Sequence, residues 1–252
     1  MANAASKLTL AVPSKGRLKD ATAELFARSG MAVRKTGHDR GYRGALDGLD
    51  DVEIVFLSAA EIVHHLRSGR VQLGITGEDL IRETLTDVER TVEFLAPLGF
   101  GQADVVVAVP DCWIDVSRMV DLEDVAAQFS REHGRRLRVA TKYMNLTRRF
   151  FAAQGVAGYR IVESVGATEG TPGAGTAELI VDITTTGTTL RANHLKILED
   201  GLILRSQAQL IASRTADWSP ASVRLRAAIL DRITKTRGVQ ALGPVAAQWV
   251  KG

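Results

Sequence analysis

The sequence predicts an α/β protein made of two successive units. Short β-branched apolar runs alternate with helical patterns, as Leu8–Val12 and Leu18–Arg28 do, which is typical of strands covered by helices. The alternation is interrupted by two adjoining strand-like runs within residues 91–109 and then starts again. No low-complexity linker separates the two series. We therefore expect two lobes enclosing a cleft, with ligands at the carboxyl ends of the strands.

The first series repeats a strand followed by a helix, which favours a parallel sheet. The expected strands are Leu8–Val12, Glu53–Leu57 and Val71–Ile75. The expected helices are Leu18–Arg28, a segment with Ala60, Val63 and Leu66 on one face, and Gly77–Leu85. Thr91–Leu98 and Ala103–Val109 follow as two strands joined at Gly99–Gly101.

The second series has the same character and ends in a helical tail. Its expected helices are Leu122–His133, Leu146–Gln154 and Thr188–His194. Its expected strands are Leu137–Ala140, Tyr159–Val162, Leu179–Ile183, Ile197–Leu204 and Gln207–Ala212. Pro220–Thr234 is an amphipathic pattern, for which Ser219 suits the N-cap and Pro220 the first helical position.

Composition excludes several classes of protein. The 252 residues are 45% hydrophobic with a net charge of +3, which argues against disorder. The 32 Lys and Arg form no basic block, so we expect no nucleic-acid partner. No apolar run approaches the roughly 20 residues of a membrane span, and Met1–Lys7 has no signal core, so we expect a cytoplasmic protein. The single Cys112 and five scattered histidines give no metal pattern.

The most informative segment is Glu169–Leu190, where a buried strand runs into five threonines around Gly187 and then a helix. Such a turn offers backbone N–H groups, hydroxyls and a helix N-terminus to a phosphate. Glu169 and Asp182 would repel bare phosphate, but they could accept hydrogen bonds from sugar hydroxyls or hold Mg²⁺ on a diphosphate. The segment therefore indicates a phosphosugar, although threonines that merely cap the helix are the alternative.

Two other strand-to-helix turns carry candidate groups. In Pro13–Leu18, Lys15 and Arg17 could neutralise a diphosphate or triphosphate, or could simply be solvated cations. In Gly74–Asp79, helix capping by Thr76 or Asp79 is the stronger interpretation. The nucleotide P-loop and the Gly-x-Gly-x-x-Gly fingerprint are both missing from the sequence, which argues against an ordinary kinase, GTPase or dehydrogenase.

These segments together resemble the ATP phosphoribosyltransferase family. The resemblance rests on Leu8–Leu18, Leu73–Leu80, Val139–Tyr143 and above all Glu169–Leu190, which matches the family's phosphoribosyl diphosphate (PRPP) signature. It implies two periplasmic-binding-protein-like (type II) lobes around a central cleft. Lobe I would be residues 1–102 completed by 196–252, and lobe II residues 103–195 with the PRPP loop. The chain departs from the family at Glu178, usually Asp, and at Ser58, where some members carry Arg.

The resemblance also implies a reaction, in which N1 of ATP attacks C1 of PRPP with inversion and releases diphosphate as the first step of L-histidine biosynthesis. This pentosyl transfer would depend on electrostatic positioning, without a general base, and on Mg²⁺ bound mainly through substrate phosphates. The implied PRPP ligands are Glu169, Asp182, Thr185, Thr186, Gly187, Thr188 and Thr189. The implied ATP ligands are Lys15, Gly16, Arg17, Gly77 and Tyr143. The candidate cations for the leaving diphosphate are Lys15, Arg17, Arg40 and Arg43.

Length bears on regulation. Long family members have an ACT-like regulatory domain, whereas here only a helical tail follows Ser213. The chain therefore resembles the short form, which implies a separate regulatory subunit similar to histidyl-tRNA synthetase and a homodimer within a larger hetero-oligomer. Two alternatives remain: a non-catalytic two-lobed binding or sensor protein, and another phosphoribosyltransferase. In the purine-salvage type the acidic pair stands immediately before the loop, unlike Asp182 with the distant Glu169.

Overall fold

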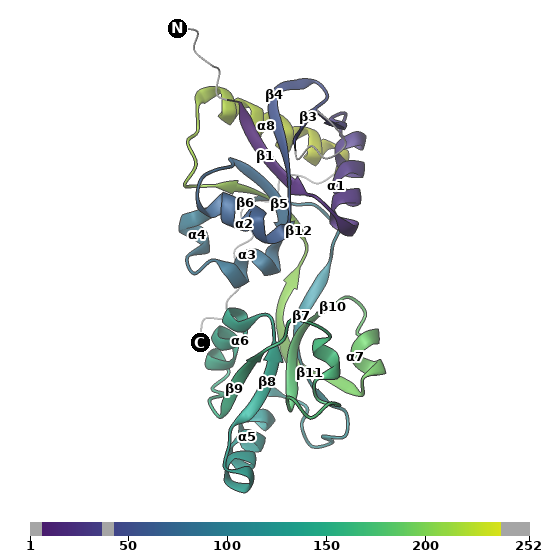
Figure 1. Ribbon diagram of the computed structural model, residues 1–252, viewed down its shortest axis with the longest axis vertical. Coiled ribbons are helices and arrows are strands. Elements are labelled where there is room, and N and C mark those ends of the chain that lie inside the picture. The colour runs from purple at the N-terminus through teal and green to yellow at the C-terminus, as the bar shows by residue number, and fades with distance from the viewer. Residues whose placement is uncertain (1–6, 37–42, 238–252) are drawn as a thin grey trace. The chain divides into compact units, whose positions relative to one another are not determined.

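The computed structural model describes residues 7–36 and 43–237, which fold as two compact units (Figure 1). Unit 1 combines the chain up to Gly101 with the chain from Gln207 onward, and unit 2 is Gln102–Ser206. The return to unit 1 thus comes later than the boundary expected at residue 195. The reason is that β11 (Leu195–Ser206) pairs along its length with β7 (Ala103–Pro110) in the sheet of unit 2.

Unit 1 is built on a seven-stranded sheet with the order β2-β3-β4-β1-β5-β12-β6. Its strands are β1 (Leu8–Pro13), β2 (Val33–Lys35), β3 (Arg43–Leu46), β4 (Leu49–Leu57), β5 (Leu73–Gly77), β6 (Val92–Pro97) and β12 (Ala208–Ser213). The expectation of a parallel sheet holds for β4, β1 and β5. The expected strand at 207–212 is β12, which enters this sheet antiparallel to β5 and β6 after the chain returns from β11 of unit 2.

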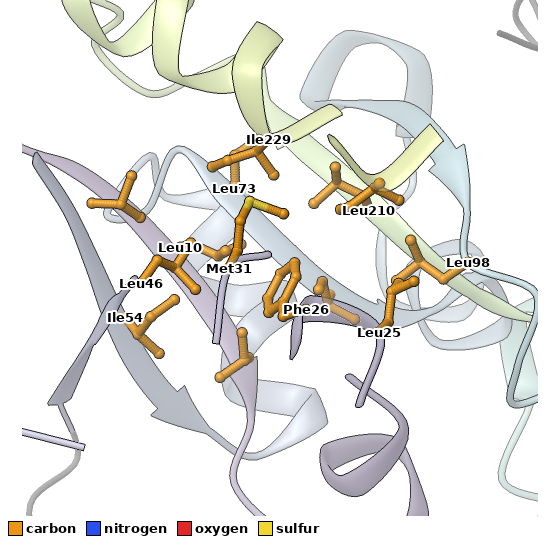
Figure 2. Close-up of a cluster of buried hydrophobic side chains, with 14 of the residues drawn as sticks. Leu10, Leu25, Phe26, Met31, Leu46, Ile54, Leu73, Leu98, Leu210 and Ile229 are labelled. Atoms are coloured by element: carbon orange, nitrogen blue, oxygen red, sulfur yellow. The ribbon is translucent and has the colours of Figure 1, made fainter. Parts of the chain in front are cut away.

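Helices cover both faces of the unit 1 sheet. They are α1 (Gly16–Arg28), α2 (Ala59–Arg67), α3 (Glu78–Thr84), α4 (Val88–Thr91) and α8 (Pro220–Arg237). Along β1, Leu10 packs with Phe26 of α1 and Ile229 of α8, as Figure 2 shows, whereas Ala11 packs on the other face with Ile62 of α2. This two-residue alternation of a buried strand makes two cores, which hold the turns at the sheet edge in place.

Unit 2 is built on a five-stranded sheet with the order β11-β7-β10-β8-β9. Its other strands are β8 (Leu137–Thr141), β9 (Tyr159–Glu163) and β10 (Leu179–Thr184), and its helices are α5 (Met119–His133), α6 (Met144–Ala153), α7 (Thr188–Ala192) and the 3-10 turn η1 (Thr168–Gly170). Strands β10, β8 and β9 are parallel, so their carboxyl ends share one edge. That edge carries the acidic and threonine-rich segments.

Three details of the fold bear on the sequence-based predictions. The short elements β2, β3 and α4 have no counterpart among the expected elements. The N-cap prediction for the last helix is confirmed, because Ser219 Oγ accepts a hydrogen bond from the N–H of Ser222 at 3.1 Å. Among the described residues, no helix is long and apolar enough to cross a membrane.

Candidate functional site

The threonine-rich turn of unit 2 joins β10 to α7 and has a fixed backbone. Gly187 has a φ of +70°, a conformation that favours glycine, and its N–H donates to Thr184 Oγ1 at 2.9 Å. The hydroxyls of Thr186 and Thr188 hydrogen-bond each other at 2.8 Å. Gly187 itself occupies the N-cap position of α7, and Thr186 Oγ1 accepts a hydrogen bond from the N–H of Thr188 at 3.4 Å at the start of the helix. The exposed side chains are those of Thr185, Thr186, Thr188 and Thr189.

Asp182 is a buried carboxylate at the edge that the turn extends. The residue is 9% exposed, and its Oδ1 has no hydrogen-bond partner among the described residues. Lys142 Nζ lies 3.5 Å from Oδ1, an ion pair too loosely aligned to count as a hydrogen bond. Because burying an unsatisfied carboxylate costs free energy, this arrangement is typical of a group kept for a ligand.

Strand register brings Lys142 to Asp182. Strands β8 and β10 are parallel with Val139 opposite Leu179, so the residues after Thr141 and Val181 are neighbours at the same edge. Half of the Lys142 side chain is exposed, and its Nζ lies 5.3 Å from the centre of the Tyr143 ring. Sequence reasoning missed Lys142, because the pairing of the two strands cannot be read from either strand alone.

Glu169 belongs to a compact loop beside β10. It lies half-buried in η1, which contacts β10. The loop is held by its own hydrogen bonds, among them Thr171 Oγ1 to the carbonyl of Thr168 at 2.7 Å and the N–H of Thr176 to the carbonyl of Thr171 at 3.0 Å. The structure thus gathers Glu169, Asp182 and the threonine turn around one strand of unit 2.

An arginine clamp fastens the end of this loop to β8. Glu178 accepts hydrogen bonds from Arg138 Nη2 at 2.7 Å, from the Arg138 N–H at 2.7 Å and from Arg135 Nη2 at 3.1 Å. Arg138 Nη2 also donates to the Gly175 carbonyl at 2.8 Å. Burial raises the pKa of Glu178, but the bonds from Arg138 and Arg135 outweigh it and hold that pKa at about 2, below the usual 4.5. Glu178 therefore stabilises the loop by joining its end to β8.

Tyr143 lies in the core of unit 2, contrary to what an adenine platform needs. The residue is 5% exposed and packs with the apolar cluster that includes Phe151 and Val139. Stacking on an adenine needs a free ring face, and the ammonium of Lys142 stands over this ring. The group that this corner presents to solvent is therefore Lys142.

In unit 1, the turns after β1 and β5 lie at one sheet edge, because β1 and β5 are neighbouring parallel strands. Lys15, Gly16 and Arg17 are exposed at the start of α1, and the Ser14 N–H ties their loop to the Leu57 carbonyl at 2.8 Å. Gly77 begins α3, where a Cβ would clash with the Asp79 carboxylate. The structure thus places the four candidates of unit 1 in two turns at the same edge of the sheet.

The cations expected for the diphosphate are placed differently. Arg43 Nη1 pairs with Glu53 Oε1 at 2.8 Å on the adjacent strand, while its side chain is 72% exposed. Arg40 lies outside the described residues. Ser58 forms a capping box with Glu61 at the start of α2, so the place where some family members carry Arg holds a helix cap. Lys15 and Arg17 are the exposed cations at the edge of β1 and β5.

The described residues contain no group of three or more His, Cys, Asp or Glu side chains that could hold a metal ion. A second cation that sequence reasoning missed is Arg191, whose Nη2 donates to the Thr186 carbonyl at 3.1 Å. Helical spacing from Gly187 is the signal that could have found it.

Comparisons with known proteins point to one family. A family model described as ATP phosphoribosyltransferase matches residues 58–235. An ATP phosphoribosyltransferase of Rhodopseudomonas palustris (strain BisB18) is 61% identical over 224 residues, 89% of this chain and 69% of that protein. One from Bradyrhizobium sp. (strain ORS 278) is 59% identical over 90% of this chain and 70% of its own length.

Two solved structures share the fold. A chain of the ATP phosphoribosyl transferase (HisG:HisZ) complex from Thermotoga maritima aligns with a TM-score of 0.67 and 23% identity, over 91% of this chain and 98% of that one. The alkanesulfonate-binding protein SsuA from Xanthomonas axonopodis pv. citri aligns with a TM-score of 0.52 and 12% identity, over 94% of this chain and 75% of that one. The predicted class, an α/β fold of two units like those of solute-binding proteins, is confirmed.

Proposed function

This chain belongs to the ATP phosphoribosyltransferase family, and from that premise we propose how its residues divide the work of the transfer. The enzyme joins the phosphoribosyl group of PRPP to N1 of ATP, which gives N1-(5-phospho-β-D-ribosyl)-ATP and diphosphate. This is the first step of L-histidine biosynthesis. The identity of about 60% to named transferases separates this function from that of a solute-binding protein with the same fold.

Unit 2 binds the donor. The observation that carries this assignment is the buried Asp182 carboxylate in the strand that leads into the threonine turn, whose Oδ1 has no hydrogen-bond partner within the described parts of the chain. The turn, Thr185–Thr189, holds the 5′-phosphate through its hydroxyls and backbone N–H groups. Asp182 and Glu169 accept hydrogen bonds from the ribose hydroxyls, which satisfies the buried oxygen.

Unit 1 binds polyphosphate. Lys15, Gly16 and Arg17 at the start of α1, with Gly77 at the start of α3, face the phosphate oxygens of ATP or the departing diphosphate. As the C1–O bond breaks, the ribose gains oxocarbenium character and the leaving group gains negative charge. Cations that tighten on that charge lower the barrier, so the reaction needs orientation and electrostatics, and no side chain acts as general base.

Mg²⁺ fits the residues of this site only as a partner of the substrate phosphates. The two carboxylates assigned to the donor are Asp182 within β10 and Glu169 in η1 beside it, fewer than an all-protein Mg²⁺ site would use. Mg²⁺ commonly takes one or two carboxylates and completes its shell with waters and phosphate oxygens. When bound, it neutralises the diphosphate of PRPP. The protein's share is to hold the sugar so that C1 faces the attacking nitrogen.

The direct test is incubation of the chain with ATP, PRPP and Mg²⁺. The amount of phosphoribosyl-ATP, followed by its absorbance, should equal the amount of diphosphate released. Production of neither, in the full chain and in the complex purified from the native host, would contradict the proposed function.

Replacing Thr188 by Val should raise KM for PRPP about tenfold, because the isosteric change removes one hydroxyl from an anion site. KM for ATP should stay within twofold, since ATP is assigned to unit 1. Steady-state kinetics with each substrate varied in turn measure this. Thr147→Val, in α6 of the same unit, is the matched control, because the Thr147 hydroxyl bonds the Tyr143 carbonyl at 2.6 Å and does not face the turn. Equal losses for both substrates would contradict the assignment of the turn.

Regulation is assigned to a separate subunit similar to histidyl-tRNA synthetase, as the HisG:HisZ complex from Thermotoga maritima suggests by likeness of fold. We propose a homodimer of this chain within such a hetero-oligomer, acting in the cytoplasm. The isolated chain should then be insensitive to micromolar histidine, and sensitivity should return when the partner is added. Inhibition of the isolated chain by micromolar histidine would contradict this assignment.

A further inference from the structure

Arg191 folds back over the threonine turn. It lies in α7, one helical turn after Gly187, so its side chain can reach the loop that precedes the helix. Its Nη2 donates to the Thr186 carbonyl at 3.1 Å and lies 3.4 Å from Thr188 Oγ1. Its Nη1 is 3.0 Å from where a Cβ on Gly187 would stand, so the guanidinium lies directly against the glycine.

The charges around β10 show why such a contact matters. Glu169 and Asp182 bring two negative charges and Lys142 brings one positive charge to Asp182. Opposite Thr184, Asp104 on β7 adds a third negative charge, with Arg205 of β11 as its neighbour in the sheet, and the threonines are neutral. Helix α7 has only five residues, so its aligned peptide dipoles add little. A sugar phosphate carries roughly two negative charges at neutral pH. A cation fixed beside the turn therefore adds to what its hydroxyls and backbone N–H groups offer a phosphate. Among the described residues, the guanidinium that contacts the turn is that of Arg191.

The hydrogen bonds that Arg191 makes within the protein leave N–H donors that can bind a phosphate. Its hydrogen bonds to described residues use Nη2, while Nε and Nη1 have further N–H donors in the same rigid plane. The residue is exposed, so its charge is not buried before the ligand arrives. Anchoring Nη2 on the Thr186 carbonyl fixes the plane beside the threonine hydroxyls, which reduces the entropy lost when a phosphate binds.

We propose that Arg191 is a further substrate-binding residue, whose guanidinium pairs with the 5′-phosphate of PRPP on the threonine turn. The proposal rests on the proposed function, because it takes the turn to be the donor's phosphate site. Arg191 serves the phosphate that stays on the sugar and has no part in releasing the diphosphate.

Two probes distinguish the phosphates of the donor. Ribose 5-phosphate carries only the phosphate assigned to the turn, and inorganic diphosphate carries only the leaving group. Arg191→Met should raise the dissociation constant of ribose 5-phosphate about tenfold, the size of one charge-assisted hydrogen bond at a partly exposed site, and should leave that of diphosphate within twofold. Isothermal titration calorimetry of the full chain measures both constants. Arg131→Met, on exposed α5 of the same unit, is the matched control for loss of charge.

Two more variants distinguish the effect of the Arg191 charge from the effect of its hydrogen bond to the turn. Arg191→Lys keeps the charge and should recover part of the affinity for ribose 5-phosphate. Arg191→Gln keeps an amide donor for the turn without the charge and should behave like Arg191→Met. A Gln variant that binds ribose 5-phosphate as well as the wild type would overturn the proposal, as would a loss confined to diphosphate.

Failure of this proposal can be told apart from failure of the proposed function. If Thr188→Val weakens ribose 5-phosphate while Arg191→Met does not, the turn is the phosphate site and Arg191 has no part in it. If neither variant changes binding of ribose 5-phosphate, the turn itself is assigned wrongly. Raising the ionic strength should shrink the difference between wild type and Arg191→Met, because salt screens an exposed charge pair.

Discussion

Asp182→Asn should weaken PRPP binding on the order of a hundredfold and leave ATP binding within twofold. The amide has nearly the same shape as the carboxylate but lacks its charge, and it replaces one acceptor by a donor. Losing two charge-assisted hydrogen bonds to ribose hydroxyls corresponds to about 3 kcal/mol. The effect should be large because Asp182 is 9% exposed and its Oδ1 has no hydrogen-bond partner among the residues that the structure describes.

Stability separates this role from a structural one. In the free protein, Asp182 is a buried carboxylate with a loose ion pair to Lys142, so the neutral amide should leave the free energy of unfolding unchanged or raise it. Equilibrium binding of each substrate and urea unfolding, measured on the same samples, test both statements. Asp124→Asn, an exposed position in α5, is the matched control. A variant that loses stability and both substrates together would show that Asp182 supports the fold.

Glu178→Gln should destabilise unit 2 by about 2 kcal/mol at pH 7, less than the loss of a fully buried ion pair, because both arginines are partly exposed. The side chain of Glu178 is 12% exposed and binds Arg138 and Arg135. In the variant these arginines lose the negative charge and one of the two acceptor oxygens of their common partner. The loop that carries Glu169 then loses its attachment to β8, so affinity for PRPP should also fall. Urea unfolding measures the loss of stability, and amide hydrogen exchange in β8 and β10 shows whether that loss lies in unit 2. Glu132→Gln, at the exposed end of α5, is the control.

The pH dependence of this difference has a definite sign. The pKa of Glu178 is about 2 in the folded chain and 4.5 in the unfolded reference, so the unfolded state takes up the proton first as pH falls. The stabilisation by Glu178 is therefore complete above pH 4.5 and is lost progressively between pH 4.5 and pH 2. The gap between wild type and Glu178→Gln should close over that range. A gap that is constant from pH 7 to pH 3 would mean that packing, and not the charged clamp, holds the loop.

Much of the fold could be predicted from local patterns. Apolar runs such as Leu8–Val12 are buried strands because their side chains fill cores on both faces of the sheet. Strands β2 and β3 could not be predicted, because Val33–Lys35 and Arg43–Leu46 are short and include basic residues. Their pairing with each other and with β4, and not their own pattern, makes them strands. The direction of β12 depends likewise on where the chain returns from unit 2.

The candidate site shows the same division. The threonine turn could be predicted, because strand, glycine and helix are consecutive in the sequence and the turn keeps that order. Lys142 could not, since its position beside Asp182 depends on the register of β8 against β10. Tyr143 was expected to be a binding surface, but a residue that follows a buried strand and begins α6 is drawn into the core. The role of Glu178 could not be predicted either, because its bonds to Arg138 and Arg135 depend on how the end of the loop meets β8.

The threonine turn of unit 2 is the proposed site of the donor's sugar phosphate. A crystal structure of the chain with PRPP and Mg²⁺ would show where that phosphate binds. We expect electron density for the 5′-phosphate against Thr185–Thr189 and for the ribose hydroxyls within hydrogen-bond distance of Asp182. Density for that phosphate at the start of α1, or anywhere else away from the turn, would contradict the account.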